Sequence, residues 1–281
     1  MSLYTTLISA EQLRALGDAV VLIDTSFDLA DTAAGERSYR EAHLPSAHYL
    51  HLDRDLSGAK TGHNGRHPLP RREDFARLVG SLGLTPASQA VVYDRQGAMF
   101  AARAWWLLRW LGHRAVAVLD GGLPAWVASG GAVSSEAMPR REGAAPYPAS
   151  RTTGMPIIDA DTLLQRLGRL RLLDARAGER FRGEVEPLDK QAGHIPGATL
   201  RFFKDNLQAD GRFKPAEQLR AEFAALIASM PADGVVQQCG SGATACHNLL
   251  AMEHAGLGTS LLYPGSWSEW SSDPSRPIAI G

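Results

Sequence analysis

The fold of this chain is indicated most clearly by residues 235–245, which are VVQQCGSGATA. The first four are typical of a short buried strand, and a helix-forming run follows at 246–255, so Cys239 ends a strand and opens a loop. Two glycines and the absence of proline let this loop curl with its backbone N–H groups pointing inward at the start of a helix. Such a nest stabilises a thiolate, which is the reactive form of cysteine. The alternative is a cysteine that only packs in the core.

The composition argues against several classes of protein. The 281 residues carry a net charge of −1, so neither nucleic acid nor an anionic membrane surface is expected as a partner. No apolar run approaches the ~20 residues of a membrane span, and the first residues lack the pattern of a signal peptide. With only Cys239 and Cys246 present, we expect no disulfide framework and a reducing, cytoplasmic setting. No zinc-type spacing is present, and we expect neither a metal nor a cofactor.

The chain contains an internal duplication, because four anchor residues of the first half recur in the second half at nearly one offset. The pairs are Asp24 with Asp174, His43 with His194, Asp94 with Cys239, and Gly121 with Gly265. Strands alternate with helices in both halves, which predicts an α/β fold of two tandem domains, each a mainly parallel sheet with helices on both faces. A stretch rich in Gly, Ser, Pro and Ala predicts a linker at 136–155 between domains 1–135 and 156–281.

Periodicity and end signals also predict the individual elements. Ser9 and Gln12 form the pattern of a capping box that opens a first helix. The helix predicted at 98–111 is apolar on most faces, which is typical of a helix in a core. Strands are predicted at 19–24, 89–94, 115–120, 171–174, 234–238 and 260–263, and further helices at 71–82, 216–228 and 246–255.

Three segments together resemble the rhodanese superfamily: CGSGATAC at 239–246, HIPGA at 194–198 and PGSWSEW at 264–270. The resemblance covers nearly the whole chain as two tandem rhodanese-like domains. Asp94 stands in the first domain where Cys239 stands in the second, so the resemblance implies a first domain without a catalytic cysteine. The uncharged pair at 240–241 is similar to the 3-mercaptopyruvate branch, whereas the thiosulfate branch usually has basic residues there.

This resemblance implies a sulfurtransferase. The Cys239 thiolate would take a sulfur atom from 3-mercaptopyruvate, become a persulfide, and pass the sulfur to cyanide, a small thiol or a thioredoxin-like protein. Such two-step covalent catalysis gives ping-pong kinetics. The alternatives are a sulfurtransferase that uses thiosulfate and a sulfur carrier that does not turn over. A cysteine phosphatase is disfavoured because it needs an arginine six residues after the cysteine, and position 245 is alanine.

The cysteine loop contains most of the candidate site residues. By resemblance, the substrate would be bound by Gly240, Gly242, Ala243 and Thr244. The family usually has valine at the position of Ala243. Ser241 can turn its hydroxyl towards the sulfur or a substrate carboxylate. Thr244 can cap the following helix or donate to the thiolate. In the alternative interpretation both hydroxyls only bond to the nearby backbone.

An arginine after the strand at 171–174 is a candidate for binding the donor. By resemblance, Arg180 lies where 3-mercaptopyruvate sulfurtransferases place a substrate-binding arginine, whose planar fork suits a carboxylate. The alternative is a surface ion pair with Glu179 or Glu184. The family usually has a second arginine shortly afterwards, where this chain has Leu188, and we therefore expect weaker binding of the donor.

Two candidates come from the first half of the chain. The segment GRHPLP at 65–70 resembles the one that supplies a histidine, here His67, to the 3-mercaptopyruvate site. Asp53 resembles a nearby acidic position. A histidine suits proton transfer near neutral pH, although an exposed loop histidine is the alternative.

Overall fold

The computed structural model describes residues 3–17, 20–150, 152 and 154–281, and these form two compact units. Unit 1 consists of Met1–Gly58, Pro70–Gly154 and Ala209–Arg212, and unit 2 consists of Ala59–Leu69, Met155–Gln208 and Phe213–Gly281. The segment Ala59–Leu69 comes from the first half of the chain but belongs to unit 2. The candidate His67 is therefore part of the same unit as Cys239.

Unit 1 is built on a five-stranded parallel sheet. The order of its strands is β1 (Leu7–Ile8), β5 (Val116–Leu119), β4 (Gln89–Tyr93), β2 (Val20–Asp24) and β3 (His48–Tyr49). Every residue of the central strand β4 is buried, as expected for a strand covered on both faces. The helices of this unit are α1 (Ala10–Leu16), α2 (Ala34–Glu41), α3 (Arg72–Ser81), α4 (Ala101–Trp110) and α5 (Gly122–Ala128).

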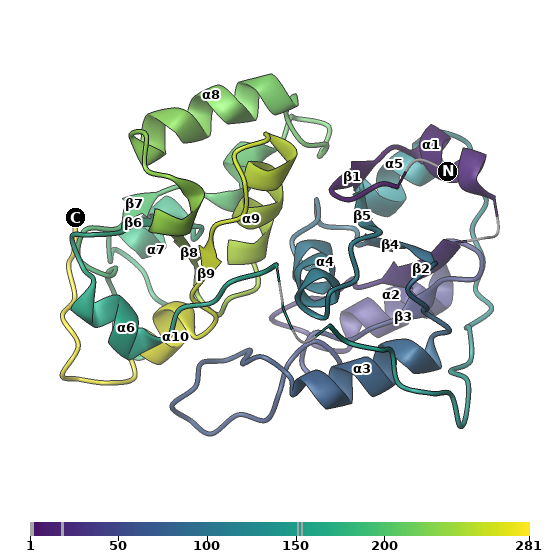
Figure 1. Ribbon diagram of the computed structural model, residues 1–281, viewed down its shortest axis with the longest axis horizontal. Coiled ribbons are helices and arrows are strands. Elements are labelled where there is room, and N and C mark those ends of the chain that lie inside the picture. Colours follow the sequence, from purple (N-terminus) through teal and green to yellow (C-terminus); the bar gives the residue numbers. More distant parts are fainter. Residues whose placement is uncertain (1–2, 18–19, 151, 153) are drawn as a thin grey trace. The chain divides into compact units, whose positions relative to one another are not determined.

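Helices cover both faces of this sheet. Leu13 of α1 and Leu123 of α5 pack in one cluster with Val91 and Ala117 of the strands, and Figure 1 shows α1 and α5 side by side. Helix α4 packs against β4 and β5 and contains Trp105 and Trp106, which are fully buried. The predicted apolar helix at 98–111 is thus confirmed as part of the core of unit 1.

Unit 2 has the same plan with a smaller sheet. Its parallel strands are ordered β7 (Thr199–Leu200), β6 (Arg171–Asp174), β8 (Val235–Gln238) and β9 (Leu261–Leu262). In Figure 1, α6 and α10 lie together on one side of the sheet, and α8 and α9 lie together on the other. The helices are α6 (Ala160–Gln165), α7 (Gly178–Phe181), η1 (Phe203–Asn206), α8 (Ala216–Ile227), η2 (Ala232–Gly234), α9 (Ala245–His254) and α10 (Ser266–Trp270).

The predicted α/β fold with two parallel sheets is confirmed. The capping box at the first helix is also present, since Gln12 N–H donates to Ser9 Oγ and Ser9 N–H donates to Gln12 Oε1. The duplicated histidines have the same structural role in the two units. His43 stacks on Tyr39 and His194 stacks on Phe181, each with ring centroids 3.9 Å apart.

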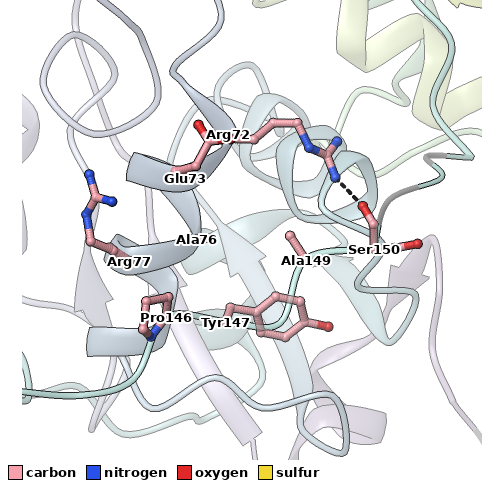
Figure 2. A pocket seen from close by; sticks show the side chains of 8 residues that line it. All are labelled: Arg72, Glu73, Ala76, Arg77, Pro146, Tyr147, Ala149 and Ser150. Atoms are coloured by element: carbon pink, nitrogen blue, oxygen red, sulfur yellow. Dashed lines mark hydrogen bonds between the residues drawn. The ribbon is translucent and has the colours of Figure 1, made fainter.

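The segment predicted as a linker, 136–155, lies mostly along unit 1. Its backbone is bonded to α3 and its surroundings, where Tyr147 N–H donates to Ala76 O at 2.9 Å. A cavity of about 470 Å³ lies between α3 and this segment, and Figure 2 shows the side chains that line it. At its edge the Arg72 guanidinium donates to Ser150 O at 2.7 Å. This cavity marks where the segment docks on α3, and the predicted domain bounds stay predictions.

Within the described part of the chain, every helix is too short or too polar to cross a lipid bilayer. The same residues contain no group of three or more His, Cys, Asp or Glu side chains arranged to hold a metal ion.

Candidate active site

Cys239 lies directly after β8, one of the two inner strands of the unit 2 sheet, and the loop that follows leads into α9. Sites of parallel α/β sheets lie beyond the carboxyl ends of the strands, which is where this residue is found. Cys239 is only 1% exposed, and both cysteines are free. The cysteine is thus buried at the carboxyl edge of the sheet.

The backbone of the loop curls around the sulfur. The N–H groups of Ser241 and Gly242 point at Cys239 Sγ, with N···S distances of 3.4 and 3.1 Å. Gly242 has a φ of +80°, and a Cβ at this position would overlap Pro264 O. A side chain there would be strained and would clash, so the close approach of the two segments requires glycine.

The start of α10 holds the cysteine loop from the other side. Cys239 N–H donates to Ser266 Oγ at 3.1 Å, and Trp267 N–H donates to Cys239 O at 2.9 Å. Ser268 N–H donates to Gly240 O at 2.9 Å. The segment PGSWSEW therefore has a structural function, because it fixes the backbone that carries the sulfur.

Ser241 and His67 are in contact although they are far apart in the sequence. His67 Nδ1 lies 2.7 Å from Ser241 Oγ, and both side chains are nearly buried. The interpretation of His67 as an exposed loop histidine is therefore wrong. The pair joins an imidazole to the hydroxyl of the cysteine loop, and such a pair can hold or pass a proton.

Thr244 occupies the N-cap position of α9, but its side chain makes no capping hydrogen bond. The alternative that it caps this helix is therefore wrong. Ala243 is buried and its carbonyl accepts from Cys246 N–H at 3.1 Å, so it belongs to the turn into α9. Substrate contacts of Gly240, Gly242, Ala243 and Thr244 stay predictions.

Arg180, on α7, is part of a buried cluster of charges. Its guanidinium binds Glu186 through Nη2 at 2.6 Å and Asp189 through the same nitrogen at 3.1 Å. Neither Glu179 nor Glu184, the partners considered from the sequence, is used: Glu184 pairs with Arg182 instead. The ion pairs of Arg180 are with inward-facing carboxylates and not on the surface.

Arg66 is a member of this cluster that the sequence analysis did not select. Its Nη1 pairs with Asp189, whose carboxylate thus bridges Arg66 and Arg180. Burial raises the pKa of the Asp189 carboxyl, while the Arg66 guanidinium acts to lower it. Its position directly before the candidate His67 could have suggested a place in the site. Only the assignment of Ala59–Leu69 to unit 2 shows that Arg66 belongs to the same unit as Cys239.

Both guanidiniums lie against the cysteine loop. A Cβ added to Gly240 would lie 2.9 Å from Arg66 Nη2 and 3.3 Å from Arg180 Nη1. Glycine at 240 therefore leaves room for two cationic groups beside the residue that follows the cysteine. This arrangement can hold an anion next to the cysteine loop.

The structure gives other surroundings to three further residues, Arg176, Leu188 and Asp53. Arg176 is buried, binds Asp174 at 2.7 Å and stacks 4.7 Å from the ring of Trp267, so its head is fully used in the structure. Leu188, where a second arginine was expected, is 43% exposed. Asp53 belongs to unit 1, where its backbone N–H donates to a nearby histidine ring, and its role in the site stays a prediction.

In unit 1, Asp94 occupies the place of Cys239 after the central strand β4. Its carboxylate accepts four backbone N–H groups at 2.8 to 3.0 Å. The donors are those of Gln96, Ala98, Phe100 and Ala101. Burial raises the pKa of Asp94, and these hydrogen bonds act to lower it. The loop of unit 1 therefore surrounds an internal anion that has no sulfur.

The chain is similar to known proteins over nearly its whole length. The rhodanese-like domain family matches it twice, at residues 9–129 and 159–273. A protein of Pseudomonas aeruginosa named "Probable 3-mercaptopyruvate sulfurtransferase" is 50% identical, with 98% of both chains covered. The thiosulfate sulfurtransferase of Cricetulus griseus is 34% identical, with 99% of this chain and 97% of that protein covered.

A solved structure agrees with these relatives. The 3-mercaptopyruvate sulfurtransferase from Leishmania major matches with a TM-score of 0.85 and 28% identity, over 98% of this chain and 76% of that chain. The chain therefore belongs to the rhodanese-like family, as a tandem-domain sulfurtransferase.

Proposed function

We propose that this enzyme transfers the sulfur atom of 3-mercaptopyruvate, through a persulfide on Cys239, to a thiol or to cyanide. The Cys239 thiolate attacks the donor's sulfur and forms an S–S bond. The C–S bond of the donor breaks, its electron pair stays on carbon, and this carbon takes up a proton to give pyruvate. An acceptor thiolate or cyanide then attacks the outer sulfur, the S–S bond breaks, and the Cys239 thiolate is restored.

The observation that carries this proposal is the geometry around Cys239 Sγ. Two backbone N–H groups point at the sulfur from an uncharged loop, and such donors favour the thiolate over the thiol. The same N–H groups can donate hydrogen bonds to the outer sulfur of a persulfide. Because the N–H groups come from the backbone, the loop offers hydrogen bonds to one negative charge without adding a fixed positive one.

The Ser241 hydroxyl and the His67 ring support the proton transfer that the release of pyruvate needs. Their contact of 2.7 Å makes a path along which the imidazole can supply a proton through the hydroxyl. The sequence resemblance also makes Asp53 a candidate for this proton transfer. Its contribution is tested by comparing Asp53→Asn with the unmodified enzyme over a range of pH.

Thiosulfate is the second candidate donor, and one observation favours it. Arg66 and Arg180 bring two positive charges to Gly240, and these would suit a doubly charged donor that releases sulfite. The similarity to a thiosulfate sulfurtransferase agrees with this candidate. However, Asp189 and Glu186 already balance these two guanidiniums, so we rank 3-mercaptopyruvate first.

The acceptor and the setting follow from the thiol chemistry. A small thiol or a thioredoxin-like protein fits a persulfide that must be cleaved by a second thiolate. Both cysteines are free and buried, which supports a reducing, cytoplasmic setting. Unit 1 would contribute no nucleophile, because Asp94 cannot form a persulfide.

The test compares the two donors directly. We expect intact mass to increase by one sulfur atom after incubation with 3-mercaptopyruvate, and kcat/KM to be higher for 3-mercaptopyruvate than for thiosulfate with the same acceptor. A higher kcat/KM for thiosulfate would establish the second candidate instead. Sulfur loading without repeated turnover would indicate a carrier, and no loading by either donor would overturn the proposal.

A further inference from the structure

Two carboxylates from one short turn pair with the arginines beside the cysteine loop. Asp189 is shared by two guanidiniums, since one of its oxygens binds Arg66 Nη1 and the other lies 3.1 Å from Arg180 Nη2. Glu186 binds Arg180 Nη2 at 2.6 Å and lies 3.5 Å from Nη1 of Arg176. The side chains of both carboxylates are only 4% exposed. Solvent therefore screens their charges much less than it screens charges on the surface.

The turn that carries Asp189 is fixed by Glu186. The N–H groups of Leu188 and Asp189 donate to Glu186 Oε1 at 3.1 and 3.2 Å. Arg66 is fixed from another side, because its N–H donates to Ser268 Oγ at 3.0 Å. Burial raises the pKa of Asp189, and the Arg66 guanidinium acts to lower it. The Asp189 carboxylate is thus built into the structure and is not a mobile surface charge.

The ion pairs balance the formal charge of this group of side chains, because three guanidiniums are matched by three carboxylates. The members are Arg66, Arg176, Arg180, Asp174, Glu186 and Asp189. Lys190 lines a cavity of about 170 Å³ beside this group, but it is exposed, so solvent screens its charge. The guanidinium nitrogens closest to Gly240 therefore offer N–H donors to an anion without a large excess of positive charge.

We propose that Asp189 is a specificity-determining residue, whose carboxylate offsets the charge of Arg66 and Arg180 and so disfavours a doubly charged sulfur donor relative to a singly charged one. The proposal rests on the proposed function, since it concerns the donor that Cys239 attacks. 3-Mercaptopyruvate carries one carboxylate, whereas thiosulfate carries two negative charges. Coulomb energy is proportional to charge, so a fixed carboxylate repels thiosulfate about twice as strongly as a single carboxylate at the same distance. Specificity of this kind comes from a repulsive element and not from an extra contact.

The first test compares kcat/KM for thiosulfate and for 3-mercaptopyruvate in the unmodified enzyme and in Asp189→Asn. Asparagine keeps the shape and one acceptor oxygen and removes one negative charge. We expect the ratio of kcat/KM for thiosulfate to that for 3-mercaptopyruvate to rise by about tenfold, the size of one additional charge–charge interaction in a partly shielded site. A ratio of two donors in one protein sample does not depend on the fraction of active enzyme, so a purely structural role would leave it unchanged.

Two further variants isolate the charge of Asp189. Asp189→Glu keeps the charge, and its donor ratio should stay within about threefold of the unmodified enzyme. Glu184→Gln is the matched control, since it removes one carboxylate that pairs with Arg182 outside the group and is 56% exposed. Its ratio should also stay unchanged. An unchanged ratio in folded Asp189→Asn would overturn the proposal, and so would equal shifts in Asp189→Asn and either of these two variants.

Leu188→Glu keeps the proposal testable if Asp189→Asn does not fold. Leu188 is 43% exposed and lines the same cavity as Asp189, so a glutamate there adds a negative charge without emptying a packed site. The donor ratio should move the opposite way, towards 3-mercaptopyruvate, by roughly two- to fivefold because solvent screens part of the added charge. A shift towards thiosulfate, or none, would then overturn the proposal.

A binding measurement separates this proposal from the proposed function. Pyruvate carries one negative charge and sulfate carries two, and neither has a sulfur atom that Cys239 can take. Both are titrated into Cys239→Ser protein with and without Asp189→Asn, pyruvate by ligand-observed NMR and sulfate by its displacement of pyruvate. We expect Asp189→Asn to tighten sulfate binding about tenfold more than pyruvate binding.

The two possible failures are distinguishable. Equal effects of Asp189→Asn on sulfate and pyruvate overturn the inference even if the enzyme loads sulfur. If the unmodified enzyme loads sulfur from neither donor, the proposed function fails whatever the anion titration shows. The shift of the donor ratio is defined whichever donor the unmodified enzyme prefers, so a preference for thiosulfate corrects the proposed donor without deciding the role of Asp189.

Discussion

The loops that follow the central strands of the two units have the same construction and different contents. In unit 1 the carboxylate of Asp94 fills the loop and accepts four backbone N–H groups. In unit 2 the sulfur of Cys239 occupies the corresponding place and faces two backbone N–H groups of its own loop, those of Ser241 and Gly242. Even the supporting turn is equivalent, since Leu123 N–H donates to Asp94 O and Trp267 N–H donates to Cys239 O.

This comparison shows what the duplicated fold provides and what it leaves to one residue. A loop of inward N–H groups needs a hydrogen-bond acceptor at its centre, because buried donors without a partner are costly. A carboxylate satisfies that need but cannot accept a sulfur atom to form a persulfide. A cysteine satisfies it with an atom that can also react. The two loops thus share a backbone plan and differ in the residue at its centre, which is a carboxylate in unit 1 and a thiol in unit 2.

Removing the sulfur from the unit 2 loop is expected to have the largest effect. Cys239→Ser should lower the rate of sulfur transfer by roughly a thousandfold or more, because the nucleophile is lost. Cys246→Ser is the matched control, since Cys246 Sγ donates to Gly242 O, which a hydroxyl can also do. Intact mass after donor treatment should show the added sulfur in the control alone. Near-normal transfer by Cys239→Ser would exclude the mechanism.

Emptying the unit 1 loop should affect stability and not sulfur loading. Asp94→Ala leaves four buried N–H groups without their acceptor, and we expect a loss of roughly 3 kcal/mol in the free energy of unfolding. Asp94→Asn keeps one acceptor oxygen and should lose less. The measurements are denaturant unfolding and persulfide loading by mass. A normally stable Asp94→Ala protein that no longer loads sulfur would show that unit 1 takes part in the chemistry.

The sequence of unit 1 predicts no contact like the one between Ser241 and His67. Removing this contact therefore tests a feature of the unit 2 loop that the shared fold does not provide. Ser241→Ala and His67→Asn should each reduce kcat by about a hundredfold, with the pH profile of kcat altered in both. Because the two side chains act through one hydrogen bond, the double variant should be little worse than either single variant. Fully multiplicative effects would indicate that the two side chains act independently.

The smallest expected effect concerns pH. Burial acts to raise the pKa of Glu222 in unit 2, but hydrogen bonds from Arg201, Lys214 and Gln218 outweigh it and lower the pKa to about 2. The carboxylate therefore stabilises the folded unit above the ordinary value of 4.5, and this stability is lost as pH falls towards about 2.

Asp94 in unit 1 has the opposite sign. Its raised pKa means that its contribution to stability is present below its ordinary pKa and is lost as pH rises through the folded value.

The prediction concerns Glu222. The unmodified enzyme should lose the stability that the Glu222 carboxylate contributes as pH falls below about 4.5. Glu222→Gln has no such carboxylate, so its free energy of unfolding should depend less on pH in this range, by up to about 1 kcal/mol. Melting curves in a series of acidic buffers measure this, and an unchanged acid dependence in Glu222→Gln would contradict it.

Local patterns in the sequence predicted much of the fold and the centre of the site. The strand, loop and helix around Cys239 and the capping box at Ser9 were visible because the interactions that decide them join residues a few positions apart. The duplication was visible because the same local patterns recur in the second half of the chain. The requirement for glycine at position 242 is also local, because the tight turn there gives this residue a positive φ. The family resemblance rested on the same short segments.

The sequence by itself thus determined the two α/β repeats, the candidate nucleophile Cys239, and the aspartate that stands at the corresponding place in the first repeat. Only the tertiary structure decided what surrounds the sulfur. His67 reaches Ser241 across 174 positions, and Arg66 meets Arg180 at Gly240, because Ala59–Leu69 packs into unit 2. Arg180 likewise pairs with Glu186 and Asp189 and not with its neighbours in the chain. Such partners are chosen by the packing of whole segments and the need to pair buried charges, and neither leaves a periodic signal in the sequence.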